Sequence, residues 1–300
     1  MYITDRKNSL GLTLHHFNKH CYYWSQRKEP THKWPSWHNH TGSFPRFSNC
    51  PTVGLSVERY KLEMEINKEA WELFAITDHA HAIAIQHTTL AWPYNWYESS
   101  EIPDKYEKLG ITEQRYRQYV ERGDALKNGK TFFSGLEVEV DASGRCLVPD
   151  WAWEHMDLII GSVHHNPINE KTWVEDFFLY LDRILAFPCD FIGHPVRAIR
   201  RFSTQTHTLP HELLDEVIKK LYDKGSALEI NAHYPQFADD VYLLRKAYEK
   251  GMEIAFSLDL HYPEEFSNWR YFEDVVEMSD IPFEKLKLFT PKKLKAKTNQ

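Results

Sequence analysis

The segment TFFSGLEVEV at residues 131–140 is dominated by aromatic and β-branched residues and carries Glu137 near its end. Such a composition predicts a β-strand. A second segment of this kind, MDLIIGSVHH at residues 156–165, follows after a short interval. The next segment, TWVEDFFLYLDRILAF at residues 172–187, has helical periodicity and ends before Pro188. Strands that alternate with helices in this way are typical of βα units around a parallel sheet.

The same alternation extends in both directions along the chain. Upstream, LFAITDH at residues 73–79 predicts a strand, and TEQRYRQYVERGDALKNG at residues 112–129 predicts a helix. Further strands are predicted downstream in DFIGH at residues 190–194, SALEINAH at 226–233 and MEIAFSLDLH at 252–261. The helices predicted between and after them are LPHELLDEVIKKLYDKG at residues 209–225, ADDVYLLRKAYEKG at 238–251 and PEEFSNWRYFEDVVEM at 263–278. The order of elements therefore predicts an α/β fold with a parallel sheet.

No linker or internal repeat divides this series, so a single domain over residues 35–300 is the simplest interpretation. Residues 1–34 are polar and aromatic without a clear period, and we interpret them as an N-terminal extension. A stretch rich in Trp, Tyr and Pro begins at Leu90 and interrupts the alternation. We interpret the region near residues 90–128 as an insertion at the rim of the domain.

Composition narrows the class of protein. With 42% hydrophobic and 14% aromatic residues among 300, the chain can bury one large core. Its formal net charge of −7 disfavours a main role in binding long nucleic acid, although a local basic groove is compatible with this charge. The four cysteines form no CxxC pair, which favours reduced thiols, and neither a leader-like start nor a membrane-spanning run is visible. We therefore expect a soluble cytoplasmic protein with no membrane partner.

Histidine is abundant, at 17 residues, and is most informative where it ends a predicted strand. Six segments carry potential metal ligands near their C-terminal ends, and such ends converge on one mouth in a barrel of parallel strands. The candidates are His38 and His40 in WHNHT, Asp78 and His79 in ITDH, Glu137 in SGLE, His164 in GSVH, His194 in IGHP, and Asp259 and His261 in SLDLH. Because residues i and i+2 of a strand face the same way, HxH and DxH can each direct two ligands at one centre. The pattern predicts a metal site.

The mixture of imidazole and carboxylate ligands suits zinc, manganese or iron. A shared carboxylate can hold two such ions about 3.5–4 Å apart, and the pair lowers the pKa of a bridging water. The resulting hydroxide can attack phosphorus in line while the ions neutralise the developing charge. The predicted site therefore favours a metal-dependent hydrolase.

The order of the motifs, HxH, TDH, GxE, SxH, GHP, ExN and DxH, resembles the PHP (polymerase and histidinol phosphatase) family of metal-dependent phosphoesterases from about His38 to the C-terminus. The resemblance implies a distorted (β/α)7 barrel with up to three metal ions at the C-terminal mouth of the strands. It implies one ion held by His38, His40, Glu137 and Asp259, and a second held by the bridging Glu137 with His164 and His194. A third ion would fall to His79 and His261.

The chain departs from the family pattern just after HxH. The family usually places an Asp or a His there, whereas this chain has Pro45 and Arg46. We therefore expect two tightly held ions and a third that is weak, absent or completed by another ligand such as His81.

Substrate contacts are less sharply defined by the sequence. Arg197 follows GHP on the loop that leaves the strand, where a guanidinium could bind a substrate phosphate bidentately; helix-surface charge is the alternative. Asp78 is expected to orient a ligand, and Asn231 to form hydrogen bonds at the mouth. The catalytic candidates are Glu137, Asp259, His194 and Arg197.

The leading functional hypothesis is hydrolysis of a phosphomonoester of a small metabolite, with a small phosphorylated substrate as the partner. A nuclease or nucleotide phosphodiesterase could use the same metals. An amidohydrolase that cleaves C–N bonds is a further alternative, although that family typically bridges its metals with a modified lysine, where this chain offers Glu137. A catalytically inactive barrel that serves as a binding module is the alternative outside enzymes.

Overall fold

The structure is a computed structural model that describes residues 27–42, 54–84, 111–140, 146–164, 172–200, 208–233 and 235–292. Its centre is a sheet of seven parallel strands, hydrogen-bonded in the order in which they occur along the chain. The strands are β1 (Trp34–Ser36), β2 (Trp71–Ile76), β3 (Phe132–Val138), β4 (Leu158–Ser162), β5 (Phe191–Gly193), β6 (Ala227–Asn231) and β7 (Ile254–Ser257).

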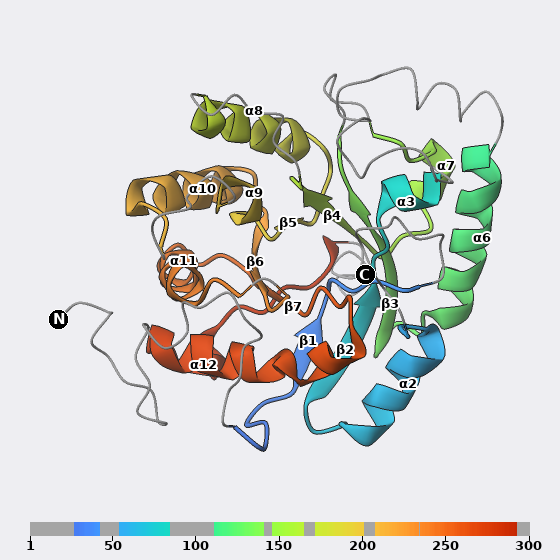
Figure 1. The fold of residues 1–300 in the computed structure, drawn as a ribbon, viewed down its shortest axis with the longest axis horizontal. Coiled ribbons are helices and arrows are strands. Elements are labelled where there is room, and N and C mark those ends of the chain that lie inside the picture. The colour runs from blue at the N-terminus through green and yellow to red at the C-terminus, as the bar shows by residue number, and fades with distance from the viewer. Residues whose placement is uncertain are drawn as a thin grey trace.

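The first and last strands also meet, so the sheet curls into a barrel. The backbone N–H of Trp37, just after β1, donates to the carbonyl of Phe256 in β7 at 3.1 Å. Farther on, the N–H of Asp259 donates to the carbonyl of His38 at 2.7 Å. The strands lie in the middle of the molecule and the helices surround them (Figure 1). The predicted distorted (β/α)7 barrel is confirmed.

Helices follow most of the strands and cover the outside of the barrel (Figure 1). They are α2 (Val57–Ile66), α3 (Ala80–Ala84), α6 (Ile111–Leu126), α7 (Asp150–Trp153), α8 (Trp173–Leu185), α9 (Arg197–Arg200), α10 (His211–Asp223), α11 (Phe237–Glu249) and α12 (Trp269–Ser279), with 3-10 turns η2 (Pro263–Asn268) and η3 (Phe283–Lys285). The single helix predicted over residues 263–278 is in fact η2 followed by α12. Helix α2 was not predicted, because apolar and charged residues alternate from Tyr60 to Ile66, without the spacing of a helix face. The Ser56 side chain caps this helix by accepting from the Arg59 N–H at 3.2 Å.

A small apolar cluster fills the lower part of the barrel. Phe289 packs against Trp37 and against Phe191, with ring centroids 5.3 and 5.0 Å apart. Trp37 directly follows β1, whereas Phe191 lies in β5. Because Phe289 contacts both, the cluster lies inside the ring of strands. Its other members alternate along their strands, as β-structure requires, and are Leu73, Ala75, Phe133, Leu158, Ile160, Ala227 and Ala255. The intervening residues face the helices in a larger outer core.

The first strand is irregular. The register of β1 against β2 shifts between Trp34 and Pro35, where proline has no N–H to donate to a ladder. The residues before β1 lie against α12, where the Arg27 Nε donates to Asp274 at 2.6 Å and the Thr31 N–H donates to Glu273 at 2.8 Å.

Within the described ranges, no helix combines the length and the apolar character needed to cross a membrane. Residues 1–26 of the predicted extension and residues 90–110 of the predicted rim insertion lie outside the described residues. The predicted domain boundaries therefore stay predictions.

Candidate metal centre

The alternation that lines the barrel with apolar side chains also delivers polar ones to its mouth. Along β3, the interior positions continue from Phe133 to Gly135 and Glu137. Along β4, they continue from Ile160 to Ser162 and then to His164 just beyond the strand. Because all strands run parallel, these polar positions gather at the C-terminal ends of the strands.

The HxH and DxH motifs face each other across the closing seam. Asn39 and Leu260 form an isolated parallel bridge beyond the ends of β1 and β7. The residues flanking this pair, which point to the opposite face, are His38, His40, Asp259 and His261. The regular strands end at Ser36 and Ser257, earlier than the sequence predicted, but the bridge preserves the spacing that turns both motifs inward.

Glu137 is the centre of the cluster and is completely buried. Its Oε2 atom lies 2.6 Å from His79 Nδ1, 3.3 Å from His38 Nε2 and 3.5 Å from His40 Nε2. Its Oε1 atom faces the other side, 3.1 Å from His164 Nε2 and 3.2 Å from His194 Nε2. The Ser162 hydroxyl donates to the same Oε1 at 2.6 Å. The two oxygens of one carboxylate therefore serve two separate sets of imidazoles.

Asp259 lies on the Oε2 side of Glu137. Its Oδ1 atom is 3.0 Å from His40 Nε2 and 3.7 Å from His38 Nε2, and its Oδ2 accepts a hydrogen bond from Asn231 Nδ2 at 3.1 Å. Its backbone has a φ of 53°, in the left-handed region that residues other than glycine rarely adopt. The fold therefore holds this carboxylate in an unusual backbone conformation beside the two histidines.

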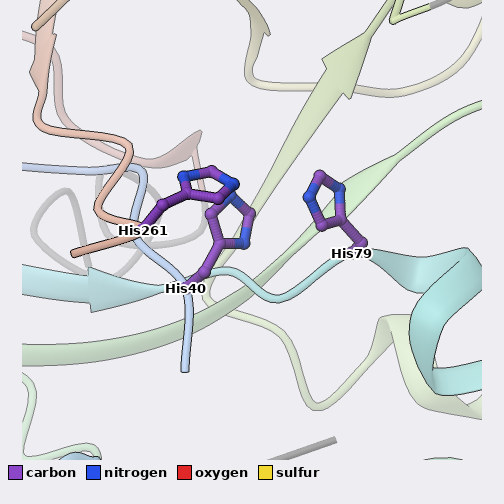
Figure 2. Close-up of side chains that lie close together, drawn as sticks. All are labelled: His40, His79 and His261. Carbon is purple, nitrogen blue, oxygen red and sulfur yellow. The ribbon is translucent and has the colours of Figure 1, made fainter. Parts of the chain in front are cut away.

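A third group consists of imidazoles alone. His40 and His79 stack with ring centroids 4.3 Å apart, and His261 meets His40 at 4.8 Å. Figure 2 shows the three rings gathered at the mouth, with His40 and His261 close together and His79 beside them. Each residue offers a nitrogen within 4.8 Å of the others.

The structure brings all the predicted metal ligands into one buried cluster. Ligand atoms lie within 4.8 Å of one another in four groups: His38, His40 and Asp259; Glu137, His164 and His194; His40, His79 and His261; and His79, Glu139 and His164. The first two groups contain the members of the two ion sites implied by the family resemblance, apart from the place of Glu137 in the first. The third group adds His40 to the predicted pair His79 and His261.

The charges of the cluster suit a divalent cation. Burial alone would raise the pKa of Glu137, but His79, His164 and His38 hold that pKa well below its usual value, so the carboxylate is ionised. Burial lowers the pKa of His79 to about 3 and that of His194 to about 4, so both rings are neutral and keep a lone pair for a metal. Burial opposes protonation of His164, yet Glu137 and Glu139 raise its pKa to about 9, so this ring must lose a proton when it binds a cation.

Buried atoms without partners provide a second test of fit. His38 Nε2 and Glu137 Oε2 lie 3.3 Å apart, and neither has a hydrogen-bond partner among the described residues. An unsatisfied buried polar atom is unfavourable by about 1–3 kcal/mol. A cation coordinated by both atoms would remove that penalty, so the donor set fits zinc or a similar ion.

Two buried carboxylates at the mouth, Glu139 and Glu229, were missed in the sequence analysis. Glu139 accepts a hydrogen bond from His164 Nδ1 and lies 2.9 Å from His81 Nδ1. Glu229 lies 3.0 Å from His38 Nδ1. The strand alternation could have identified both residues. Glu139 lies two residues after Glu137, and Glu229 is the glutamate of the ExN motif, so both occupy alternate strand positions that face the interior.

Further residues named in the sequence analysis surround the cluster or lie outside the described residues. Asp78 accepts from the N–H and hydroxyl of Thr41 at 2.5 and 2.7 Å, so it fixes the backbone after His40 rather than a ligand imidazole. Asn231 donates to Glu229 and Asp259, each at 3.1 Å. His81 is buried against Glu139 and lies outside the three-imidazole group. Pro45 and Arg46 lie outside the described residues.

Arg197 begins α9, directly after the GHP turn. Its N–H donates to the His194 carbonyl at 2.9 Å, and its side chain is half-buried. Burial is the main cause of the lowered pKa of His194, and the charge of Arg197 adds to it. Gly193 matters in the same turn, because a Cβ there would come within 2.7 Å of Ser162 Oγ and 3.2 Å of His38 Cε1. Glycine thus allows His38 and His194 to approach the same centre.

Comparison with known proteins finds a similarity of fold. No family model matches the chain, and no curated protein sequence matches it. A solved structure of similar fold is the histidinol phosphate phosphatase (HISK) from Lactococcus lactis subsp. lactis Il1403, in complex with zinc, L-histidinol and phosphate. The two share 13% sequence identity with a TM-score of 0.51, over 83% of this chain and 95% of that one. At this identity the likeness shows the fold.

Proposed function

We propose that this protein is a metal-dependent phosphoesterase that hydrolyses a phosphomonoester of a small metabolite. The observation that carries the proposal is the position of Glu137, whose two oxygens face different sets of imidazoles. A carboxylate placed in this way is suited to bridge two divalent ions. The motif order shared with the PHP family and the fold shared with a zinc-bound phosphatase support the same activity.

Different residues of the chain would hold the two ions and bind the phosphate. His38, His40 and Asp259 would hold one ion, and His164 and His194 would hold the other, with Glu137 between them. Ions in these positions would supply a nucleophile at neutral pH and neutralise charge on the phosphoryl oxygens. Arg197, beside His194, would bind a phosphate oxygen and orient the phosphoryl group for attack.

The preference for a phosphomonoester rests on charge. The net charge of −7 gives a long polyanion no general attraction. Nuclease activity, C–N bond hydrolysis and a role as a pure binding module are the alternative outcomes of the test.

The test is a comparison of substrates on metal-reconstituted protein. We would measure kcat/KM for a panel of small phosphomonoesters, for a dinucleotide and for a single-stranded oligonucleotide at equal zinc or manganese. The Glu137→Ala variant serves as the control for contaminating phosphatases. The proposal expects a phosphomonoester to be the best substrate; faster cleavage of the oligonucleotide would establish a nuclease instead.

A further inference from the structure

Glu229 lies among the candidate ligands without belonging to any of the four groups. It is 1% exposed and faces the interior from β6. Its Oε1 lies 3.0 Å from His38 Nδ1, and its Oε2 accepts hydrogen bonds from the His194 backbone N–H and, at 3.1 Å, from Asn231 Nδ2. Three nitrogens from three different strand ends therefore converge on one carboxylate.

The contact with His38 determines which ring nitrogen faces the metal. In the neutral ring, donation of the Nδ1 hydrogen to Glu229 leaves the lone pair on Nε2. That Nε2 atom lies 3.3 Å from Glu137 Oε2 and 3.7 Å from Asp259 Oδ1. Glu229 thus sets both the tautomer and the orientation of a ligand of the first ion.

The contact with His194 acts through the backbone. His194 has a φ of 32°, a conformation that a residue other than glycine adopts only when its surroundings impose it. The hydrogen bond from its N–H to Glu229 holds this peptide, and the side chain then places Nε2 3.2 Å from Glu137 Oε1. Glu229 therefore also fixes a ligand on the side of the second ion.

We propose that Glu229 is a positioning residue on which both metal ions depend, because it orients one ligand of each; this inference rests on the proposed function. Glu139 provides the contrast within the same mouth. It is equally buried and accepts a hydrogen bond from His164 Nδ1, so among the two ion sites it supports only the second.

The position requires a group that only accepts hydrogen bonds. A carboxylate offers two acceptor oxygens to the three donors, whereas a glutamine of the same size offers one oxygen and one NH2. In either orientation the NH2 of Glu229→Gln would meet a donor, the His38 Nδ1–H or the His194 N–H. The substitution therefore removes the positioning role while it conserves volume.

The experiment measures zinc affinity at each site, independently of turnover. Metal-free wild type, Glu229→Gln, Glu229→Asp and Glu139→Gln are titrated with zinc in competition with a chromophoric chelator. We expect Glu229→Gln to weaken both sites by about 10- to 100-fold, and Glu139→Gln to weaken one. Glu229→Asp keeps two acceptor oxygens on a shorter stem, and we expect it to recover part of both affinities.

The outcomes separate this inference from the proposed function. Glu229→Gln with both zinc affinities within twofold of wild type would overturn the inference, and so would loss at a single site. If Glu229→Gln does not fold, Glu229→Asp carries the test, with weaker binding at both sites supporting the inference and unchanged binding overturning it. A wild type that binds two zinc ions but cleaves no phosphomonoester would overturn the proposed function and leave this comparison intact.

Discussion

The Nε2 atom of His194 lies 3.2 Å from Oε1 of Glu137, although the two residues come from strands that are not neighbours in the sheet. The left-handed backbone of His194 and the absence of a side chain at Gly193 make this approach across the mouth possible. The carboxylate is thereby reached on one side by His194 and on the other by His79.

Replacement of Glu137 should remove metal and activity together. In Glu137→Gln, the oxygen facing one set of imidazoles is exchanged for an NH2 group that cannot bind a cation. We expect kcat/KM to fall by about three orders of magnitude or more, as for loss of a central ligand, and the bound metal per protein to fall in elemental analysis. Glu249→Gln is the matched control, because Glu249 is an exposed glutamate on α11. Full metal content in Glu137→Gln would contradict the bridging role.

Metal removal should lower stability. Without a cation, the carboxylates of Glu137 and Asp259 stay buried close together and polar atoms lack partners. An ion at 100 times its dissociation constant stabilises the native state by about 2.7 kcal/mol, or roughly 5 °C in a domain of this size. Thermal unfolding of chelated protein with and without added zinc measures this shift. An identical Tm in both samples would argue against a metal centre.

Arg197 should affect substrate binding and leave the metal in place. A charge-assisted contact to phosphate is typically worth about 1.5–3 kcal/mol, so Arg197→Ala should reduce kcat/KM by about 10- to 100-fold. Its metal content should equal that of wild type. Arg117→Ala is the control, because Arg117 is an exposed arginine on α6 paired with Glu113. Wild-type kinetics in Arg197→Ala would assign this arginine to the helix surface.

The third ion should bind more weakly than the other two. His40, His79 and His261 form its group, and His40 also directs Nε2 at Asp259 at 3.0 Å. A group of imidazoles that shares one member and has no carboxylate of its own holds a divalent cation less firmly. Zinc titration followed by calorimetry should resolve two strong sites and a weak or absent third. Three sites of equal affinity would show that a further ligand completes the group.

Much of the fold could be read from particular residues. The run from Phe132 to Val138 and the GSVH end of the next strand predicted parallel strands, and their alternation carried Glu137 and His164 to one mouth. Helix α2 escaped prediction because its only sharp signal is the Ser56 cap. The division of residues 263–278 into η2 and α12 depends on tertiary contacts, among them the hydrogen bonds from the His261 and Tyr262 N–H groups to Glu265.

The candidate ligands were visible in the sequence because each is an imidazole or carboxylate at a strand end. Their partners were harder to find. The alternation places Glu229 and Glu139 on the interior face, but their contacts with His38 and His164 depend on the closure of the barrel. The positive φ of His194 depends on the same closure, and no local sequence pattern predicts it.

Anomalous diffraction from crystals grown with zinc tests the central claim most directly. The account predicts two strong peaks about 3.5–4 Å apart, one on each side of the Glu137 carboxylate, with His38, His40 and Asp259 around the first and His164 and His194 around the second. A single peak, or peaks that do not contact Glu137, would contradict it.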